Sequence, residues 1–266
     1  MFGGTDGSGA AGAMGDTWIW DGRSWSQLNP VPSPGARAFA GMAADGAGGI
    51  ILFGGGADNA DQPRNDTWRW DGHTWTLLHP AHPGPMLSGS RVMAFDPAIH
   101  AIVLYTGAQT WEWTGSDWSE VMIPGPSATD GGPRRDFALA FDPTSRRMLM
   151  FGGTNLAPPS SALGDTWAFD GRRWTRVAVG GPAGGVAVMA TVSAGVDMLG
   201  EDGTWQWKGT VWSRLAGPSG PDWGYFGSMA QAGPASVLLV PGRQASSGSP
   251  QTHLWLWDGS SWRTVT

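Results

Sequence analysis

Tryptophan recurs through this chain in one short motif, and the repetition of that motif limits the possible fold more than any other feature. Of the 18 tryptophans, 17 lie in six copies of the motif and only Trp223 lies outside them. The first and last tryptophans are seven residues apart in each of the six copies, which run from 18 to 25, 68 to 75, 111 to 118, 167 to 174, 205 to 212 and 255 to 262. Such self-similarity indicates a chain of equivalent structural units.

Two apolar segments accompany the tryptophan motif. Each copy is preceded by an apolar run that ends in glycine, as in Ile51 to Gly55 and Met148 to Gly153, and five copies have a further apolar stretch closed by a tight turn. The sequence of each repeat unit therefore predicts four short strands, which we name A, B, C and D. The tryptophans lie on strands C and D. The Asp-Gly pair between C and D predicts a tight hairpin, because glycine accepts the positive φ that such turns require.

Four strands in a unit of about 47 residues predict a β-propeller of six blades with four-stranded antiparallel sheets. We expect a single domain over residues 1–266, with blades at about 1–29, 30–79, 80–122, 123–178, 179–216 and 217–266. The sequence opens in strand B of the first unit, so the first blade is expected to lack strand A, its innermost strand. We expect one of two explanations for the missing strand: the sequence is an N-terminally truncated version of a longer protein, or the first blade is incomplete.

Composition narrows the classes of function. The net charge of −6 and the isoelectric point near 5.2 disfavour a nucleic-acid partner. The absence of cysteine excludes thiol nucleophiles and thiolate metal sites. No apolar run approaches the roughly 20 residues that span a bilayer, so membrane insertion is not expected. We expect a monomer without a cofactor or a bound metal.

The order of these segments resembles the Kelch repeat, and it is most similar to bacterial Kelch proteins grouped with the central propeller of galactose oxidase. The resemblance is strongest in the units around Trp18, Trp68 and Trp167. It implies a binding scaffold or, less often, an enzyme, and a secreted or cell-envelope location, although this sequence shows no signal peptide. The copper-radical oxidase of that family needs a cysteine bonded to tyrosine, so this chemistry is excluded here.

Long connections gather on one predicted face. In an antiparallel four-stranded blade the B–C loops and the D–A connections share a face, and several B–C loops here have about ten residues. Loops on a rigid scaffold usually carry function. We therefore expect a non-catalytic binding or scaffold propeller that presents this loop face to a protein or glycan ligand. The alternative is a carbohydrate-active enzyme, such as a Kelch-type sugar epimerase or mutarotase, for which the sequence nominates no catalytic residue.

Six residues are candidates for ligand binding. Arg37 and Arg135 are taken as equivalent positions at the start of strand A, and Arg91 lies near the same level in its blade. In Kelch relatives arginines at this level hold acidic ligands, and the guanidinium fork suits carboxylates; the alternative is that they bond backbone carbonyls and hold blades together. Asp222, Trp223 and Tyr225 precede strand A of the last unit, where Trp223 either stacks on a sugar ring or plugs the last blade. The 17 repeated tryptophans are expected to pack between blades.

Overall fold

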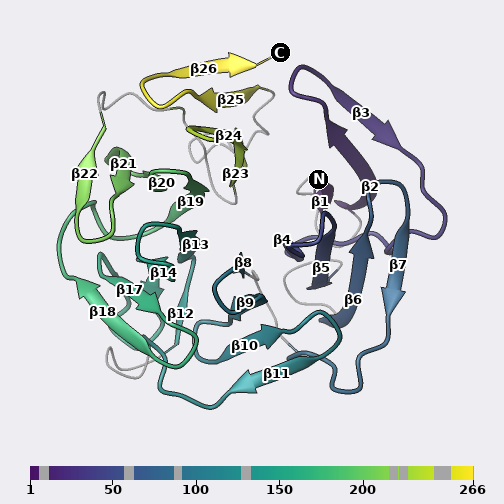
Figure 1. Ribbon diagram of the computed structural model, residues 1–266, viewed down its shortest axis with the longest axis horizontal. Helices are drawn as coiled ribbons and strands as arrows, with labels where there is room; N and C mark the ends of the chain where they lie inside the picture. The colour runs from purple at the N-terminus through teal and green to yellow at the C-terminus, as the bar shows by residue number, and fades with distance from the viewer. Residues whose placement is uncertain are drawn as a thin grey trace. The chain divides into compact units, whose positions relative to one another are not determined.

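The computed structural model describes residues 1–5, 12–56, 63–86, 92–126, 133–215, 221, 227–242 and 253–265. These residues form seven antiparallel β-sheets (Figure 1). None of them forms a helix long and apolar enough to cross a membrane. Six of the sheets follow the six sequence units, and we call them blades 1 to 6 in chain order. The fold is therefore all-β, as the repeat predicts.

Blades 1 to 3 lie within residues 1–123. Blade 1 has three strands, β1 (Phe2–Thr5), β2 (Ala13–Trp20) and β3 (Trp25–Leu28). Blade 2 has four, β4 (Gly41–Ala44), β5 (Ile50–Gly55), β6 (Arg64–Trp70) and β7 (Trp75–Leu78). Blade 3 has β8 (Val92–Asp96), β9 (Ala101–Tyr105), β10 (Thr110–Trp113) and β11 (Trp118–Val121). The three strands of blade 1 correspond to B, C and D, so the predicted absence of strand A is confirmed among the described residues.

Blades 4 to 6 lie within residues 124–266. Blade 4 has β13 (Ala138–Asp142), β14 (Arg147–Phe151), β17 (Thr166–Phe169) and β18 (Trp174–Ala178). Blade 5 has β19 (Ala187–Val192), β20 (Gly195–Gly200), β21 (Gly203–Trp207) and β22 (Trp212–Arg214). Blade 6 has β23 (Ser228–Gly233), β24 (Ser236–Val240), β25 (Leu254–Trp257) and β26 (Trp262–Val265). The seventh sheet, formed by β12 (Arg134–Arg135), β15 (Thr154–Asn155) and β16 (Ser161–Ala162), was not predicted.

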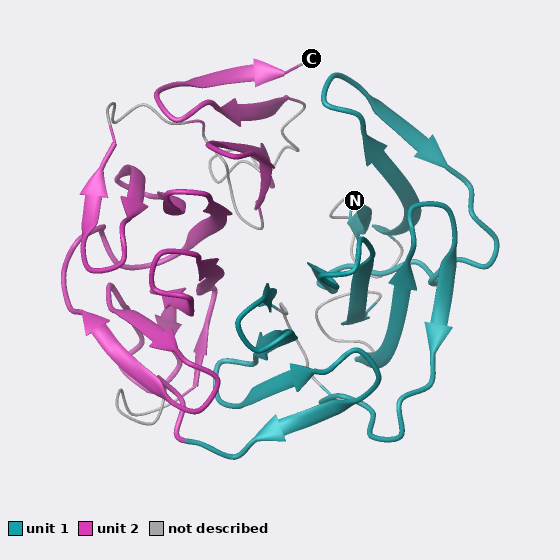
Figure 2. Cartoon of the chain, in the orientation of Figure 1, with its two compact units in different colours: residues 1–123 teal, residues 124–266 magenta. Residues whose placement is uncertain are grey.

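The chain divides into two compact units at residue 123, unit 1 over Met1–Ile123 and unit 2 over Pro124–Thr266 (Figure 2). The division lies between strands β11 and β13, one residue after residue 122, the predicted end of blade 3. Each unit therefore contains three blades, and every contact discussed below lies within one unit.

In blades 1, 2, 4 and 6 the C–D hairpin forms because one aspartate organises the turn, namely Asp21, Asp71, Asp170 and Asp258. In blade 2 the Oδ1 atom of Asp71 accepts hydrogen bonds from the amides of Thr74 at 2.7 Å and His73 at 2.8 Å. These bonds lower the pKa of Asp71 to about 2. A carboxylate held this way contributes stability above its unfolded pKa, and the contribution is lost as the pH falls through the folded pKa. The tight Asp-Gly hairpin is confirmed, with Trp70 opposite Trp75 across it.

Replacing Gly72 with alanine is expected to destabilise the protein by about 1–2 kcal/mol, because Gly72 has φ +102° and a side chain rarely adopts that conformation. No atom lies within 4 Å of a Cβ added there, so the cost would be conformational rather than steric. Gly180 is the matched control, since its surroundings are equally open and its φ is not in the left-handed range. Chemical denaturation of both variants checks this, and an equal effect at the two positions would contradict it.

The tryptophans pack inside and between neighbouring blades, as predicted. None of the 17 repeated tryptophans is exposed, and Trp75, Trp118, Trp207 and Trp257 are almost completely buried. In blades 2, 3, 5 and 6 the strand D indole donates a hydrogen bond to the strand C threonine of the preceding blade. These bonds are Trp75 to Thr17 at 3.0 Å, Trp118 to Thr67 at 2.9 Å, Trp212 to Thr166 at 2.8 Å and Trp262 to Thr204 at 2.7 Å. Each indole therefore contributes both apolar burial and a directional link between blades.

Candidate functional site

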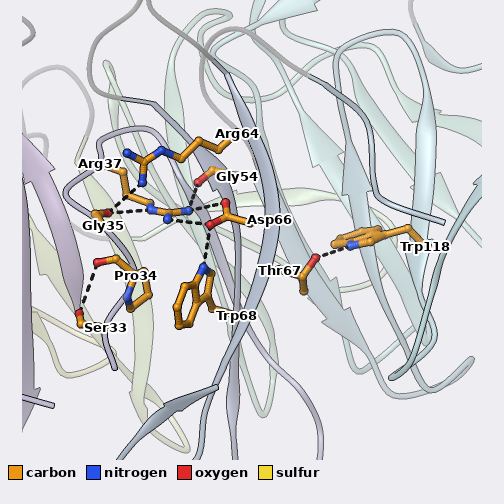
Figure 3. A network of polar contacts seen from close by, with 10 residues as sticks. All are labelled: Ser33, Pro34, Gly35, Arg37, Gly54, Arg64, Asp66, Thr67, Trp68 and Trp118. Atoms are coloured by element: carbon orange, nitrogen blue, oxygen red, sulfur yellow. Dashed lines mark hydrogen bonds and ion pairs between the residues drawn. The ribbon is translucent and has the colours of Figure 1, made fainter. Parts of the chain in front are cut away.

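Arg37 lies at the centre of a buried polar network in blade 2 (Figure 3). Its Nη1 and Nη2 atoms donate to Oδ1 and Oδ2 of Asp66 at 2.7 and 2.8 Å, a bidentate pair. Nη1 also donates to the carbonyl of Gly54 at 2.8 Å, and Nε donates to that of Gly35 at 3.0 Å. The side chain is only 1% exposed. A direct role in binding a ligand would require these contacts to break, so the geometry matches the alternative that Arg37 holds its blade together.

Arg134 repeats this arrangement in blade 4. It donates through Nη1 to Oδ1 of Asp165 at 2.9 Å and to the carbonyl of Gly152 at 3.1 Å, and through Nη2 to Oδ2 of Asp165 at 3.3 Å. Its side chain is fully buried. The expected equivalence of Arg37 with Arg135 is therefore wrong by one residue, since Arg134 is the structural counterpart of Arg37. Phe39 and Phe137 are not equivalent positions, because the backbone aligns Phe39 with Asp136, each at φ +58°.

Asp66 and Asp165, the partners of the two buried arginines, have lowered pKa values although they are partly buried. Burial opposes the ionisation of Asp66, but hydrogen bonds from Arg37 and Trp68 outweigh it and keep its pKa below the usual value. The same balance lowers the pKa of Asp165, where Arg134 and Trp167 are the donors. These carboxylates are therefore anionic structural groups at neutral pH rather than general acids.

Arg135 is the exposed arginine at this level of blade 4. Its side chain is 65% exposed, and its Nε atom lies 3.3 Å from Oδ2 of Asp136. It belongs to β12, which pairs with β15, so it lies on the small β12–β15–β16 sheet. This sheet joins the D–A connection before blade 4 to the B–C loop of the same blade. Leu156, next to β15, is also exposed. The structure thus places one predicted binding residue on a surface made of the predicted loop types.

The other four predicted binding residues, Arg91, Asp222, Trp223 and Tyr225, lie outside the described residues. Their assignment as ligand-binding residues stays a prediction. Of the six candidates, the described structure therefore positions Arg37 and Arg135, the first sealed inside a blade and the second exposed on a loop.

Exposed apolar side chains occur on the D–A connections. Four of the exposed large apolar residues lie on these connections, namely Val31, Met86, Met122 and Val179. Covering an exposed apolar side chain with a partner lowers the free energy of the system, because apolar surface is removed from water. These connections could therefore contribute apolar contacts to a ligand.

The glutamates do not form a catalytic pair within the described residues. Burial, with a further contribution from Asp96, raises the pKa of Glu112 on β10. Glu120 is half-buried and accepts a hydrogen bond from Gln109 at 2.9 Å, and Glu201 lies beside Gly185. The described parts of the chain also contain no group of three or more His, Asp or Glu side chains that could hold a metal ion.

The buried arginine–aspartate pairs were not predicted from the sequence, although both partners occupy recurring positions in the repeat. Asp66 and Asp165 directly precede the threonine of the tryptophan motif. Arg37 and Arg134 each lie four residues before the strand A residue that pairs with the phenylalanine of strand B. Only the register of strands A and B shows that these two positions meet.

The chain is similar to known proteins in fold alone. No family model matches the sequence, and no curated protein matches it. Among solved structures, that of YjhT, a Kelch-repeat protein, matches 100% of this chain and 96% of its own chain, with a TM-score of 0.68 and 14% sequence identity. A likeness at this identity establishes the fold: the chain is a Kelch-type β-propeller of six blades, the first of which has three strands among the described residues.

Proposed function

We propose that this protein is a non-catalytic binding propeller that holds a protein or glycan ligand on its B–C loops and D–A connections. The proposal also places it among propellers of the bacterial Kelch type that resemble the central domain of galactose oxidase. Blades of this kind provide a rigid framework, and the loops that they support are free to differ from one blade to the next.

The observation that carries the proposal is the contrast between Arg134 and Arg135. Arg134 is buried and paired with Asp165 inside blade 4, whereas its neighbour Arg135 is 65% exposed on the β12–β15–β16 sheet. A guanidinium in that position offers paired donors to a carboxylate of an acidic sugar or an acidic side chain. Leu156, which follows β15, adds an exposed apolar side chain next to the same small sheet.

Replacing Arg135 with alanine is expected to weaken ligand binding roughly 10- to 100-fold, the range for loss of a hydrogen bond to a charged group. A glycan array with acidic and neutral sugars identifies the ligand, and titration of the best binder measures the loss. Arg173→Ala is the matched control, because Arg173 is 79% exposed in the C–D turn of the same blade, which belongs to the other set of loops. Equal binding by the wild-type and Arg135→Ala proteins would contradict the role of Arg135.

Catalysis is distinguished from binding by the fate of the sugar. Each glycan bound on the array is incubated with the protein and followed by proton NMR, and no change of the anomeric signals is expected beyond the spontaneous rate. Protein-dependent interconversion of the sugar would overturn the non-catalytic assignment in favour of an epimerase or mutarotase.

A further inference from the structure

Asp197 is a buried carboxylic acid at a position where four other blades have an aliphatic residue. It lies on β20 of blade 5, between Ala190 of strand A and Gln206 of strand C, and it is 1% exposed. The same register in blades 2, 3, 4 and 6 places a buried aliphatic side chain opposite an alanine of strand A, namely Ile51, Val103, Leu149 and Leu238 opposite Ala43, Ala94, Ala140 and Ala230. Of these five equivalent positions, the one in blade 5 alone carries a group that can ionise.

The side chain of Asp197 belongs to the junction of blades 5 and 6, which both lie in unit 2. Side chains alternate along a strand, so Asp197 and Leu199 share one face of β20, and Leu199 packs against Leu239 of blade 6. Ala190, the strand A neighbour of Asp197, packs in one apolar cluster with Trp257 of blade 6. A charge on Asp197 would therefore lie within an apolar contact between two blades.

The surroundings of Asp197 compensate only partly for a negative charge. Nε2 of Gln206 donates a hydrogen bond to its Oδ1 atom at 2.8 Å. Burial raises the pKa of Asp197, and the opposing effects of Gln206, the Trp257 indole and the charge of Lys208 do not outweigh burial. One amide donor and an exposed cation thus replace only part of the hydration that a carboxylate loses in this position.

No second ionisable group is buried in this junction within the described part of the chain. Strands β19, β21, β23, β24 and β25 contain no Asp, Glu, Lys, Arg or His. The charged side chains on or next to the flanking strands are Asp142, Arg147, Lys208, Arg214 and Arg263. The four cations are exposed, and Asp142 accepts hydrogen bonds from Thr144 and Ser145 in its own turn. Ionisation of Asp197 is therefore the event that changes the buried charge between the described parts of blades 5 and 6.

We propose that the junction of blades 5 and 6 is a pH-sensitive contact, closed when Asp197 is protonated and loosened when Asp197 is ionised. The neutral acid fits among apolar side chains, whereas the carboxylate must regain water, and water reaches it when the contact opens. A pKa raised in the folded state gives a stabilising contribution that is complete below the unfolded pKa and is lost as the pH rises through the folded pKa. This dependence is opposite in sign to that of Asp165, whose pKa is lowered. The device lies inside unit 2 and does not depend on the proposed loop-face function.

The test follows hydrogen–deuterium exchange of the protein of residues 1–266 from about pH 5 to about pH 8, with rates corrected for the intrinsic effect of pH. In the wild-type protein the amides of β25 and β26 are expected to lose protection as the pH rises, by up to about tenfold per pH unit above the folded pKa. Asp197→Leu, which has the side chain of blades 4 and 6 at this position, is expected to keep constant protection. Asp197→Asn, which keeps the shape of the neutral acid, is expected to do the same. Glu201→Gln removes an exposed carboxylate of the same blade and is expected to retain the wild-type pH dependence.

The wild-type profile decides the matter even where a variant folds poorly. Constant protection of β25 and β26 across the pH range would overturn the proposal, and so would the same pH dependence in the wild-type and Asp197→Leu proteins. A loss of protection that extends equally to β14 and β17 of blade 4 would also overturn it, because Asp197 would then govern the stability of the whole unit rather than one junction. None of these readouts involves Arg135 or a ligand, so this test and that of the proposed function fail independently.

Discussion

Replacing Asp165 with alanine is expected to destabilise the protein by roughly 3–5 kcal/mol, because it leaves a buried guanidinium without its counter-charge. Arg134 is fully buried, and Asp165 is 6% exposed. The variant also removes the carboxylate that accepts the hydrogen bond of the Trp167 indole. Urea denaturation followed by tryptophan fluorescence measures the loss.

Two further variants separate charge from packing at this pair. The double variant Arg134→Met/Asp165→Leu is expected to recover much of the loss, since well-packed apolar residues often replace a buried ion pair at little cost. Arg173→Ala, which breaks an exposed pair with Asp170, is expected to cost at most about 1 kcal/mol. The depressed pKa of Asp165 gives the pH dependence: its contribution is present above the unfolded pKa and is lost as the pH falls through the folded value. A loss below 1 kcal/mol for Asp165→Ala would show that the pair does not stabilise blade 4.

Replacing Trp118 with alanine is expected to cost roughly 3–5 kcal/mol, the range for a large aromatic side chain removed from a core. Trp118 is 1% exposed, and its ring centroid lies 4.5 Å from that of Phe53 in blade 2 and 5.5 Å from that of Trp113 in its own blade. The substitution therefore opens a cavity at the junction of blades 2 and 3.

The hydrogen bond of Trp118 can be measured separately from its packing. Thr67→Val keeps the shape of the acceptor but leaves the indole N–H buried without it, at an expected cost of about 1–3 kcal/mol. Trp118→Phe removes the donor, so the double variant is expected to cost less than the sum of the two single variants. Thr76→Val, at an exposed position of β7, is the control and is expected to change stability by less than about 0.5 kcal/mol. Strict additivity of Thr67→Val and Trp118→Phe would contradict the coupling.

The sequence predicted the blades well because their determinants are local. Apolar alternation and Asp-Gly turns lie within a few residues of each other, so the strands around Trp70 and Trp75 could be placed without the structure. The small β12–β15–β16 sheet could not, because its strands are two residues long and include polar side chains such as Asn155 and Ser161. Their pairing depends on tertiary context rather than on periodicity.

The candidate site was less accessible to sequence reasoning. Arg134 and Arg135 are adjacent and identical in chemistry, yet one is sealed in blade 4 and the other is exposed. The two arginines are consecutive residues of β12, so their side chains point to opposite faces, and a shift of one residue in the pairing of β12 with β15 would exchange them. Likewise, the motif around Asp16 looks the same as that around Asp66, and only the sheet of blade 1 shows that its arginine is missing among the described residues.

The threonine–indole bonds have a consequence for how the chain assembles during translation. In each of the four bonds observed in the described residues, the donor comes later in the sequence than its acceptor. When a ribosome has made Trp75, Thr17 has already emerged, and the same holds for every later bond. Blades 2, 3, 5 and 6 can therefore each dock on the blade before them without waiting for residues still to be synthesised, which suits folding from the N-terminus onward.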